Sequence, residues 1–231
     1  MQRYIIKRLF YAIISLFVLS LIIFLLVRLT GDPALVIAGP DASNADIQAI
    51  RLEFGLDKPV HVQYALFIAK IFKGDMGKSF TYRIPAFKLY MQRLPASIEL
   101  AVAAMALSLI LGLPIGIIAA VKVDKGWDRF GKIIALLGMS MPSFWLGLLM
   151  ILLFSITLKW LPTSGREGVA NLIMPAIALS GYFTAAHMRL TRSSMLEVLG
   201  SEYVKLARIK GVPEFRVIIK HAFKNALLPV V

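Results

Sequence analysis

Long apolar stretches separated by polar segments dominate the pattern of this chain. Four of them, at about 9–27, 96–121, 133–158 and 170–188, come close to the length of about 20 residues that a helix needs to cross a membrane. A further apolar run begins at Ala226. The pattern predicts an all-α integral membrane protein whose spans form a polytopic helical bundle.

The segment 31–95 is too polar to cross a membrane and carries the signals of short helices. Ser43 followed by Asp46 is typical of a helix N-cap, and Gly55 suits the residue after a helix end. Pro59 favours the start of a second helix, whose apolar positions recur at helical spacing up to Gly74. This second helix is expected on the membrane surface or against the spans, or else inside a small external domain.

Three of the spans contain a proline: Pro114 in the second, Pro142 in the third and Pro175 in the fourth. Proline removes a backbone hydrogen bond and opposes the continuation of a helix. Since Gly112 and Gly116 flank Pro114, we expect a kink in the second span.

Composition supports a membrane protein and changes how the net charge is interpreted. Apolar residues make up 58% of the chain and charged residues only 17%, whereas soluble domains carry about 25% charged residues. The net charge of +13 would suggest nucleic acid in a soluble chain, but here the cations lie between apolar runs. Membrane lipid is therefore the expected anionic partner, and no nucleic acid is expected.

The distribution of Lys and Arg predicts the orientation in the membrane. The segments 1–8, 122–132 and 189–225 hold 15 of them in 56 residues, against 10 in 77 residues for 31–95 and 159–170. Because short cytoplasmic loops are enriched in Lys and Arg, we expect a cytoplasmic N-terminus and an external segment 31–95.

The sequence offers little for catalysis. Cysteine is absent, and the three histidines are far apart in the chain, which leaves no evident metal site. Gly77-Lys78-Ser79 resembles the end of a phosphate-binding loop, but Phe72 stands where that loop needs its first glycine. We expect neither an enzyme site nor a cofactor.

The basic segment 189–225 predicts two short amphipathic helices hinged at Gly211, with Pro213 starting the second. One apolar face is expected from Leu196, Leu199, Tyr203 and Leu206. A second is expected from Phe215, Ile218, Ile219 and Ala222, beside a basic stripe of Arg216, Lys220 and Lys224. Such a pair can dock a cytoplasmic protein or lie on anionic headgroups.

Beginning with this segment, motifs along the chain resemble those of a known family, the permease subunits of ABC importers in the dipeptide, oligopeptide and nickel group. The segment Lys205–Gly211 is similar to their Glu-Ala-Ala-x-x-x-Gly loop: Ala207 and Gly211 match, and Lys205 and Leu206 replace the first two residues. Further matching motifs occur in the order of the first of the two permease subunits: Leu29-Thr30-Gly31-Asp32-Pro33, Phe54-Gly55-Leu56-Asp57-Lys58-Pro59, Gly74-Asp75-Met76-Gly77-Lys78-Ser79-Phe80, Arg93-Leu94-Pro95-Ala96, Pro142-Ser143-Phe144-Trp145-Leu146-Gly147, Leu161-Pro162-Thr163-Ser164-Gly165, Arg192-Ser193-Ser194-Met195 and Asn225-Ala226-Leu227-Leu228-Pro229.

The resemblance implies an importer permease without its own ATPase site, in a bacterial or archaeal cytoplasmic (inner) membrane. The implied partners are a second permease subunit in a heterodimer, two ATPase subunits that bind the ATP, and an extracytoplasmic substrate-binding protein. The implied contact with the ATPases comprises Tyr203, Lys205, Ala207, Arg208, Gly211 and Pro213. The family also implies six spans, so the sequence is expected to be truncated at its C-terminus.

Five parts follow from this interpretation: 1–30, the N-terminal tail and first span; 31–95, the external segment; 96–188, three further spans; 189–225, the cytoplasmic coupling loop; and 226–231, the start of another span. Polar groups in or near the spans are candidates for the translocation path, although small residues also allow helices to pack closely. These groups are Ser140, Ser143, Ser180 and Thr184.

Di- and oligopeptides are the expected substrates, with nickel chelates and glutathione-like peptides as alternatives. A channel or secondary transporter that works without ATPases is a different class, disfavoured because no charged residue lies in mid-span. A third class is a membrane anchor that presents the basic helical pair to lipid or nucleic acid.

Overall fold

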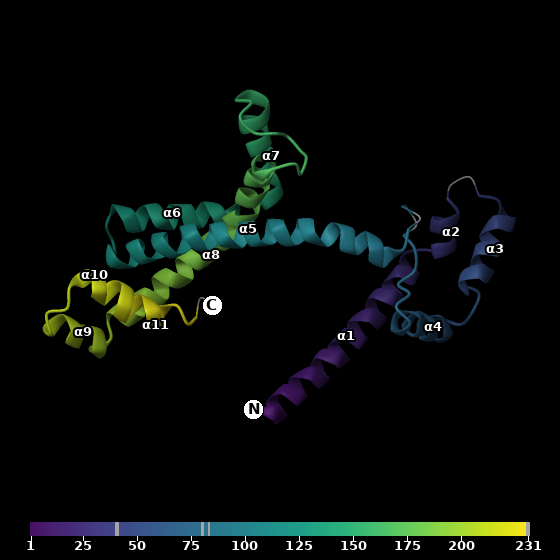
Figure 1. Cartoon of the computed structure of the whole chain (residues 1–231), viewed down its shortest axis with the longest axis horizontal. Coiled ribbons are helices and arrows are strands. Elements are labelled where there is room, and N and C mark those ends of the chain that lie inside the picture. The colour runs from purple at the N-terminus through teal and green to yellow at the C-terminus, as the bar shows by residue number, and fades with distance from the viewer. Residues whose placement is uncertain (40–41, 80, 83, 230–231) are drawn as a thin grey trace. The chain divides into compact units, whose positions relative to one another are not determined.

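Residues 1–39, 42–79, 81–82 and 84–229 are described by a computed structural model, shown in Figure 1. Their regular structure is helical, apart from an isolated bridge between Lys78 and Pro85. Three helices are long and apolar enough to cross a membrane, and a bent pair makes up to four if it counts as one span. The predicted all-α membrane fold is therefore confirmed. The chain divides into two compact units, Met1–Leu94 and Pro95–Val231.

The first unit begins with the long helix α1 (Gln2–Thr30), followed by α2 (Pro33–Ala38), α3 (Asn44–Phe54) and α4 (Val60–Phe72). Helix α1 is apolar around most of its surface, and Phe24 is its one buried residue, a pattern that suits a helix surrounded by lipid. Helix α4 packs on α1: Tyr64 stacks edge-on against Phe24, and the Tyr64 and Ser20 hydroxyls are 2.8 Å apart. Of the placements expected for the second short helix, the structure shows packing against a span.

The predicted helix signals in this unit are confirmed. The Ser43 side chain accepts a hydrogen bond from the Asp46 backbone N–H, and the Asp46 carboxylate accepts one from the Ser43 N–H. Gly55 follows α3 with φ 65°, and Gly74 follows α4 with φ 78°. Phe80, the last residue of the motif that begins at Gly74, lies outside the described residues.

The second unit contains most of α5 (Ala86–Val121), then α6 (Gly126–Ser140), α7 (Ser143–Met150), the π-helix η1 (Ile151–Thr157) and α8 (Val169–Leu199). After α8 come α9 (Glu202–Ile209), α10 (Glu214–Arg216), the π-helix η2 (Val217–Phe223) and α11 (Lys224–Ala226). Within the part of the apolar run after Ala226 that the structure describes, Leu227–Pro229 form no further helix, and residues 230–231 lie outside the described chain.

Small residues bring α5, α6 and α8 close together. Ala119, Ala135, Ala185 and Met188 form one buried cluster from these three helices. A Cβ atom on Gly112 would lie 2.9 Å from the Thr184 carbonyl oxygen, and one on Gly116 would lie 2.7 Å from that of Met188. Helix α5 runs through Pro114 without interruption, so the kink expected there does not break the helix.

Two boundaries differ from those expected. The third span is not one straight helix, because α6 and the α7–η1 helix meet at 102° around Met141 and Pro142, a corner visible in Figure 1. Helix α8 continues past Met188 to Leu199, eleven residues into the basic segment. The helix ends there, and Gly200 and Ser201 connect it to α9. Leu196 and Leu199 are consequently on a different helix from Tyr203 and Leu206, and the prediction of one common face is wrong.

Candidate functional site

A helical turn formed by α9, Gly211 and α10 stands at one end of the second unit (Figure 1); it is called here the α9–α10 turn, residues 202–216. Gly211 has φ 75°, a left-handed conformation that suits glycine. The Gly211 N–H donates to the Arg208 carbonyl at 3.0 Å and the Val212 N–H donates to that of Ala207 at 3.2 Å, which ends α9. Pro213 then directly precedes α10. The predicted bend at Gly211 between two helices is confirmed.

One side of the α9–α10 turn is buried against the rest of the unit. Val204 and Val217 are fully buried and Ala207 is 7% exposed, and together they form a cluster. Ala207 therefore faces inward, where its small side chain lets α9 lie close to η2.

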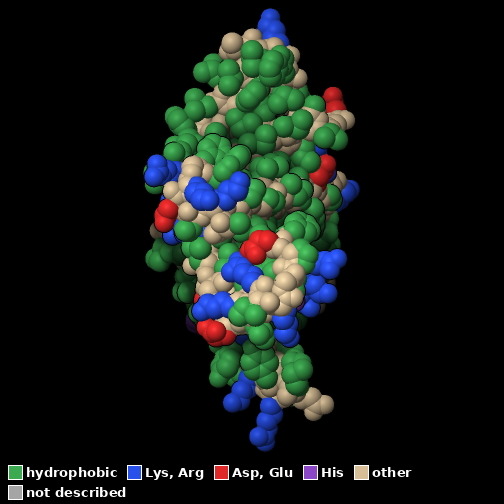
Figure 2. All heavy atoms as spheres, turned by 90° about the vertical axis from the view of Figure 1, so that its left-hand side faces the viewer, with side chains coloured by type: hydrophobic (Ala, Val, Ile, Leu, Met, Phe, Trp, Pro, Cys, Tyr) green, Lys and Arg blue, Asp and Glu red, His purple; other side chains and the backbone are tan. Residues whose placement is uncertain are grey.

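Four large apolar side chains of the turn are exposed: Tyr203, Leu206, Ile209 and Phe215. This set, which we call the outer patch, is between 44% and 81% exposed. Phe215 and Ile219 are exposed, Ile218 is partly buried, and Val217 and Ala222 are buried, so the stripe expected along the second helix is divided between an exposed and a buried side. Figure 2 views this end of the second unit, where Lys and Arg side chains gather beside hydrophobic ones.

Four charged residues of the turn form two ion pairs. Arg208 donates from Nε and Nη2 to the two carboxylate oxygens of Glu214, at 3.1 and 2.7 Å, across the Gly211 bend. Lys205 pairs with Glu202 at 2.8 Å. The hydrogen bonds from Arg208 lower the pKa of Glu214 from its ordinary value. The ion pair thus holds α9 and α10 together across the hinge.

A second cluster ties the turn to the long helices. Ala120 of α5, Met195 of α8, Ala222 of η2 and Ala226 of α11 are buried together. The Asn225 side chain also donates a hydrogen bond to the Tyr203 hydroxyl at 2.8 Å. The segment after the hinge therefore packs on α5 and α8 while the outer patch stays open.

Sequence reasoning missed a buried ion pair. Asp128, fully buried at the start of α6, accepts hydrogen bonds from Arg192 of α8 at 2.6 and 2.9 Å. Lys132 lies 2.9 Å from the same carboxylate, and the Asp124 N–H donates to it at 3.0 Å. The i,i+4 spacing of Asp128 and Lys132 was the one local signal; nothing in the sequence links Asp128 to an arginine 64 residues away.

The four candidate path residues fall into two groups. Ser140 and Ser143 flank the corner between α6 and α7 and line a cleft of about 360 Å³ together with Tyr182 of α8. Ser180 and Thr184 do not line it. Ser180 donates to the Ile177 carbonyl, and Thr184 is buried with no hydrogen-bond partner for its hydroxyl within the described chain.

Among the described residues, no group of three or more His, Cys, Asp or Glu side chains could hold a metal ion.

Two family models match this chain. Residues 1–101 match the N-terminal part of a binding-protein-dependent transport system membrane component, and residues 112–231 match the binding-protein-dependent transport system inner membrane component. The glutathione transport system permease proteins GsiC of Salmonella paratyphi A and Escherichia coli K12 are 39% and 40% identical to it. Each alignment covers 100% of this chain and 76% of the relative. The chain therefore belongs to the family of inner-membrane components of binding-protein-dependent ABC importers, which are transport permeases and not enzymes.

Proposed function

We propose that this chain is the peptide-translocating permease subunit of its importer, paired with a second, different permease subunit. The family implies ATPase and binding-protein partners. The substrate class rests on the relatives named as glutathione permeases, which align with the whole of this chain at about 40% identity. Glutathione is itself a short peptide, so small peptides of this kind are the proposed cargo.

The substrate class is tested with the importer reconstituted in vesicles with its binding protein. Uptake of labelled glutathione, a dipeptide and a nickel chelate is compared with and without ATP. We expect ATP-dependent uptake of one or both peptides. Uptake of the nickel chelate alone would contradict the peptide assignment, and uptake without the ATPase subunits would indicate a channel.

We further propose that the outer patch is the surface that an ATPase subunit contacts. Tyr203, Leu206 and Phe215 are exposed beside paired charges, an arrangement that suits a protein contact with an apolar centre and a charged rim. Ala207 supports this surface from inside, and Gly211 and Pro213 shape the bend. Lys205 and Arg208 supply electrostatic complementarity at its edge. Closure of the ATPases on ATP would then move the turn and, through it, the bundle.

A pair of aspartate substitutions tests this contact. Leu206→Asp places a charge in the outer patch, whereas Val123→Asp places one at another exposed apolar position, in the α5–α6 connection. We expect Leu206→Asp to reduce co-purification of the ATPase subunits and transport-linked ATP hydrolysis, and Val123→Asp to leave both near wild type. Equal behaviour of the two variants would remove the outer patch from the contact.

The proposed orientation places the N-terminus and the α9–α10 turn in the cytoplasm and the segment 31–95 outside. It is supported by the density of Lys and Arg in the segments 1–8, 122–132 and 189–225. Because the chain has no native cysteine, single-cysteine variants are free of background labelling. Labelling of Lys205→Cys by an impermeant reagent from outside intact cells would overturn the orientation.

For the path, we propose that substrate passes the cleft at the α6–α7 corner, where Ser140 and Ser143 are exposed. Ser180 and Thr184 would instead support the packing of α8. Single cysteines at 140 and 180 separate the two roles. A hydrophilic thiol reagent should modify Ser140→Cys, with protection by substrate, and should modify Ser180→Cys far more slowly. Similar rates would contradict this division.

A further inference from the structure

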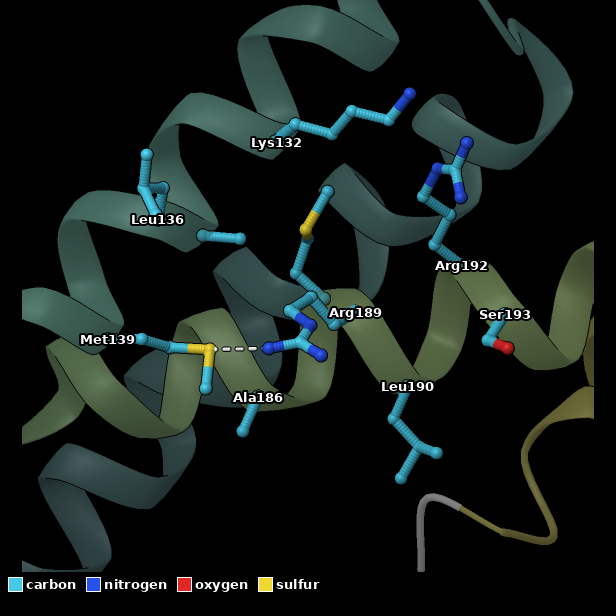
Figure 3. Close-up of a pocket in the computed structure, with 10 residues that line it drawn as sticks. Lys132, Leu136, Met139, Ala186, Arg189, Leu190, Arg192 and Ser193 are labelled. Carbon is cyan, nitrogen blue, oxygen red and sulfur yellow. Dashed lines mark hydrogen bonds between the residues drawn. The ribbon is translucent and has the colours of Figure 1, made fainter.

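A second, larger cleft lies between α6 and α8, and the proposed translocation function does not use it. Its volume is about 880 Å³, and Figure 3 shows the side chains that line it. Lys132 and Leu136 come from α6, and Arg189, Leu190 and Arg192 come from α8.

The cleft carries a surplus of positive charge. Lys132 and Arg192 share the single buried carboxylate of Asp128. Arg189, the third cation, is exposed, and within the described chain its hydrogen bond goes to the Met139 sulfur at 2.9 Å. Lys132 also lies 4.0 Å from the Asp124 carboxylate. Three cations against these two carboxylates leave one positive charge in excess, which favours an anionic ligand with acceptor oxygens.

Apart from Ser193, the remaining lining is apolar. Leu136 and Met139 follow Lys132 along one side of α6 at helical spacing, and Leu190 faces the cleft from α8. These side chains are 67%, 40% and 40% exposed, respectively. An exposed apolar surface of this kind suits contact with a hydrocarbon chain, since covering apolar surface with hydrocarbon is favourable relative to leaving it in water. The cleft therefore combines a cationic end with an apolar wall.

We propose that this cleft binds an acidic phospholipid, with the phosphodiester headgroup at Arg189, Lys132 and Arg192 and an acyl chain along Leu136, Met139 and Leu190. The charge complementarity selects an anion, and the apolar wall selects an amphiphile. A peptide fits less well because its amide groups need several hydrogen-bond partners. Among the described side chains that line the cleft, Ser193 supplies the one hydroxyl.

Lipid binding is measured on the purified importer complex by titration with phosphatidylglycerol and with phosphatidylcholine of the same acyl chains, using native mass spectrometry. The variant Arg189→Gln removes the cation that has no carboxylate partner in the described chain. Arg129→Gln is the matched control, since Arg129 is exposed on α6 but does not line the cleft. Thermal unfolding verifies that both variants fold.

The wild-type complex should retain phosphatidylglycerol in preference to phosphatidylcholine. Arg189→Gln should weaken phosphatidylglycerol binding about fivefold, which corresponds to ~1 kcal/mol for one cation near an anionic headgroup. Arg129→Gln should leave it unchanged. Equal retention of the two lipids, or equal losses in the two variants, would overturn the proposal. Displacement of the lipid by glycerol phosphate at equal concentration would show a free-phosphate site, and displacement by glutathione would show a substrate site; either result also overturns it.

Discussion

Replacing Asp128 by Asn tests the ion pair that joins the start of α6 to α8. The carboxylate is fully buried, accepts two hydrogen bonds from Arg192 and one from the Asp124 backbone, and forms an ion pair with Lys132 at 2.9 Å. Asparagine keeps the shape of the side chain but replaces one acceptor oxygen by a donor and removes the charge. The Arg192 guanidinium then faces an N–H group and loses its counter-ion.

The magnitude follows from burial. Removing one partner of a buried ion pair costs about 3–5 kcal/mol, because the other charge is left uncompensated. The Arg192 side chain is 21% exposed and that of Lys132 is 52% exposed, so water relieves part of the cost. We therefore expect a loss at the lower end, about 3 kcal/mol of unfolding free energy. Arg192→Gln should lower the free energy of unfolding by a similar amount. The double variant should lower it by much less than the sum of the two single losses.

The Glu99–Arg166 pair is the matched control. It has a comparable N–O distance of 2.9 Å, but its side chains are 51% and 56% exposed. Because exposed ion pairs contribute less than about 1 kcal/mol, Glu99→Gln should change stability little. The measurement is unfolding of the importer by SDS in mixed micelles, with the second permease unchanged. If Asp128→Asn and Glu99→Gln lost equal stability, or if the effects of Asp128→Asn and Arg192→Gln were additive, the argument from burial would be refuted.

Three further outcomes are expected. Gly116→Ala should destabilise the bundle by about 1–3 kcal/mol through overpacking, because the new Cβ would lie 2.7 Å from a carbonyl oxygen; Gly126→Ala meets nothing within 4 Å and should be neutral in the same unfolding assay. Gly211→Val should lose transport-linked ATP hydrolysis while membrane insertion is retained, since φ 75° costs an L-residue roughly 1–2 kcal/mol; unchanged stimulated hydrolysis would contradict the hinge role. The depressed pKa of Glu214 means that its pair with Arg208 stabilises the turn above the ordinary value of 4.5 and loses this effect as the pH falls through the lower pKa of the folded state. Proteolysis of the turn as a function of pH should show this acid-induced opening, and Arg208→Gln should abolish it.

Local chemistry made part of the fold predictable. Both ends of α3 are determined by a few neighbouring residues. At its start, the side chains of Ser43 and Asp46 accept hydrogen bonds from each other's backbone N–H groups, and at its end Gly55 adopts the left-handed conformation that stops the helix. Gly211 acts in the same way at the end of α9. Such signals need no tertiary context, which explains why the caps and the hinge were predicted correctly.

Features that depend on tertiary packing were not predictable. The apolar face of α9 was expected at Tyr203 and Leu206, but Val204 and Ala207 are the buried residues. All four are apolar or largely apolar, so periodicity alone does not decide which side meets η2. The sharp corner near Pro142 shows the same limit, whereas α5 runs through Pro114 as one helix. A proline removes one hydrogen bond in both cases, and its neighbours decide whether the helix ends.

The kinds of residue in the second unit determine how a pull on the α9–α10 turn would spread. Val204 and Val217 join the turn to η2, and Ala120, Met195 and Ala222 join η2 to α5 and α8. Alanine and glycine have no side-chain rotamers that could absorb a displacement, and valine has few, so Met195 is the one flexible side chain among these residues. At Gly112 and Gly116, α5 lies so near α8 that an added Cβ would be within 2.9 Å of a carbonyl oxygen of α8. Under the proposed ATPase contact, a displacement of the turn would be passed on largely as movement of whole helices, so this packing favours rigid-body rocking over local rearrangement.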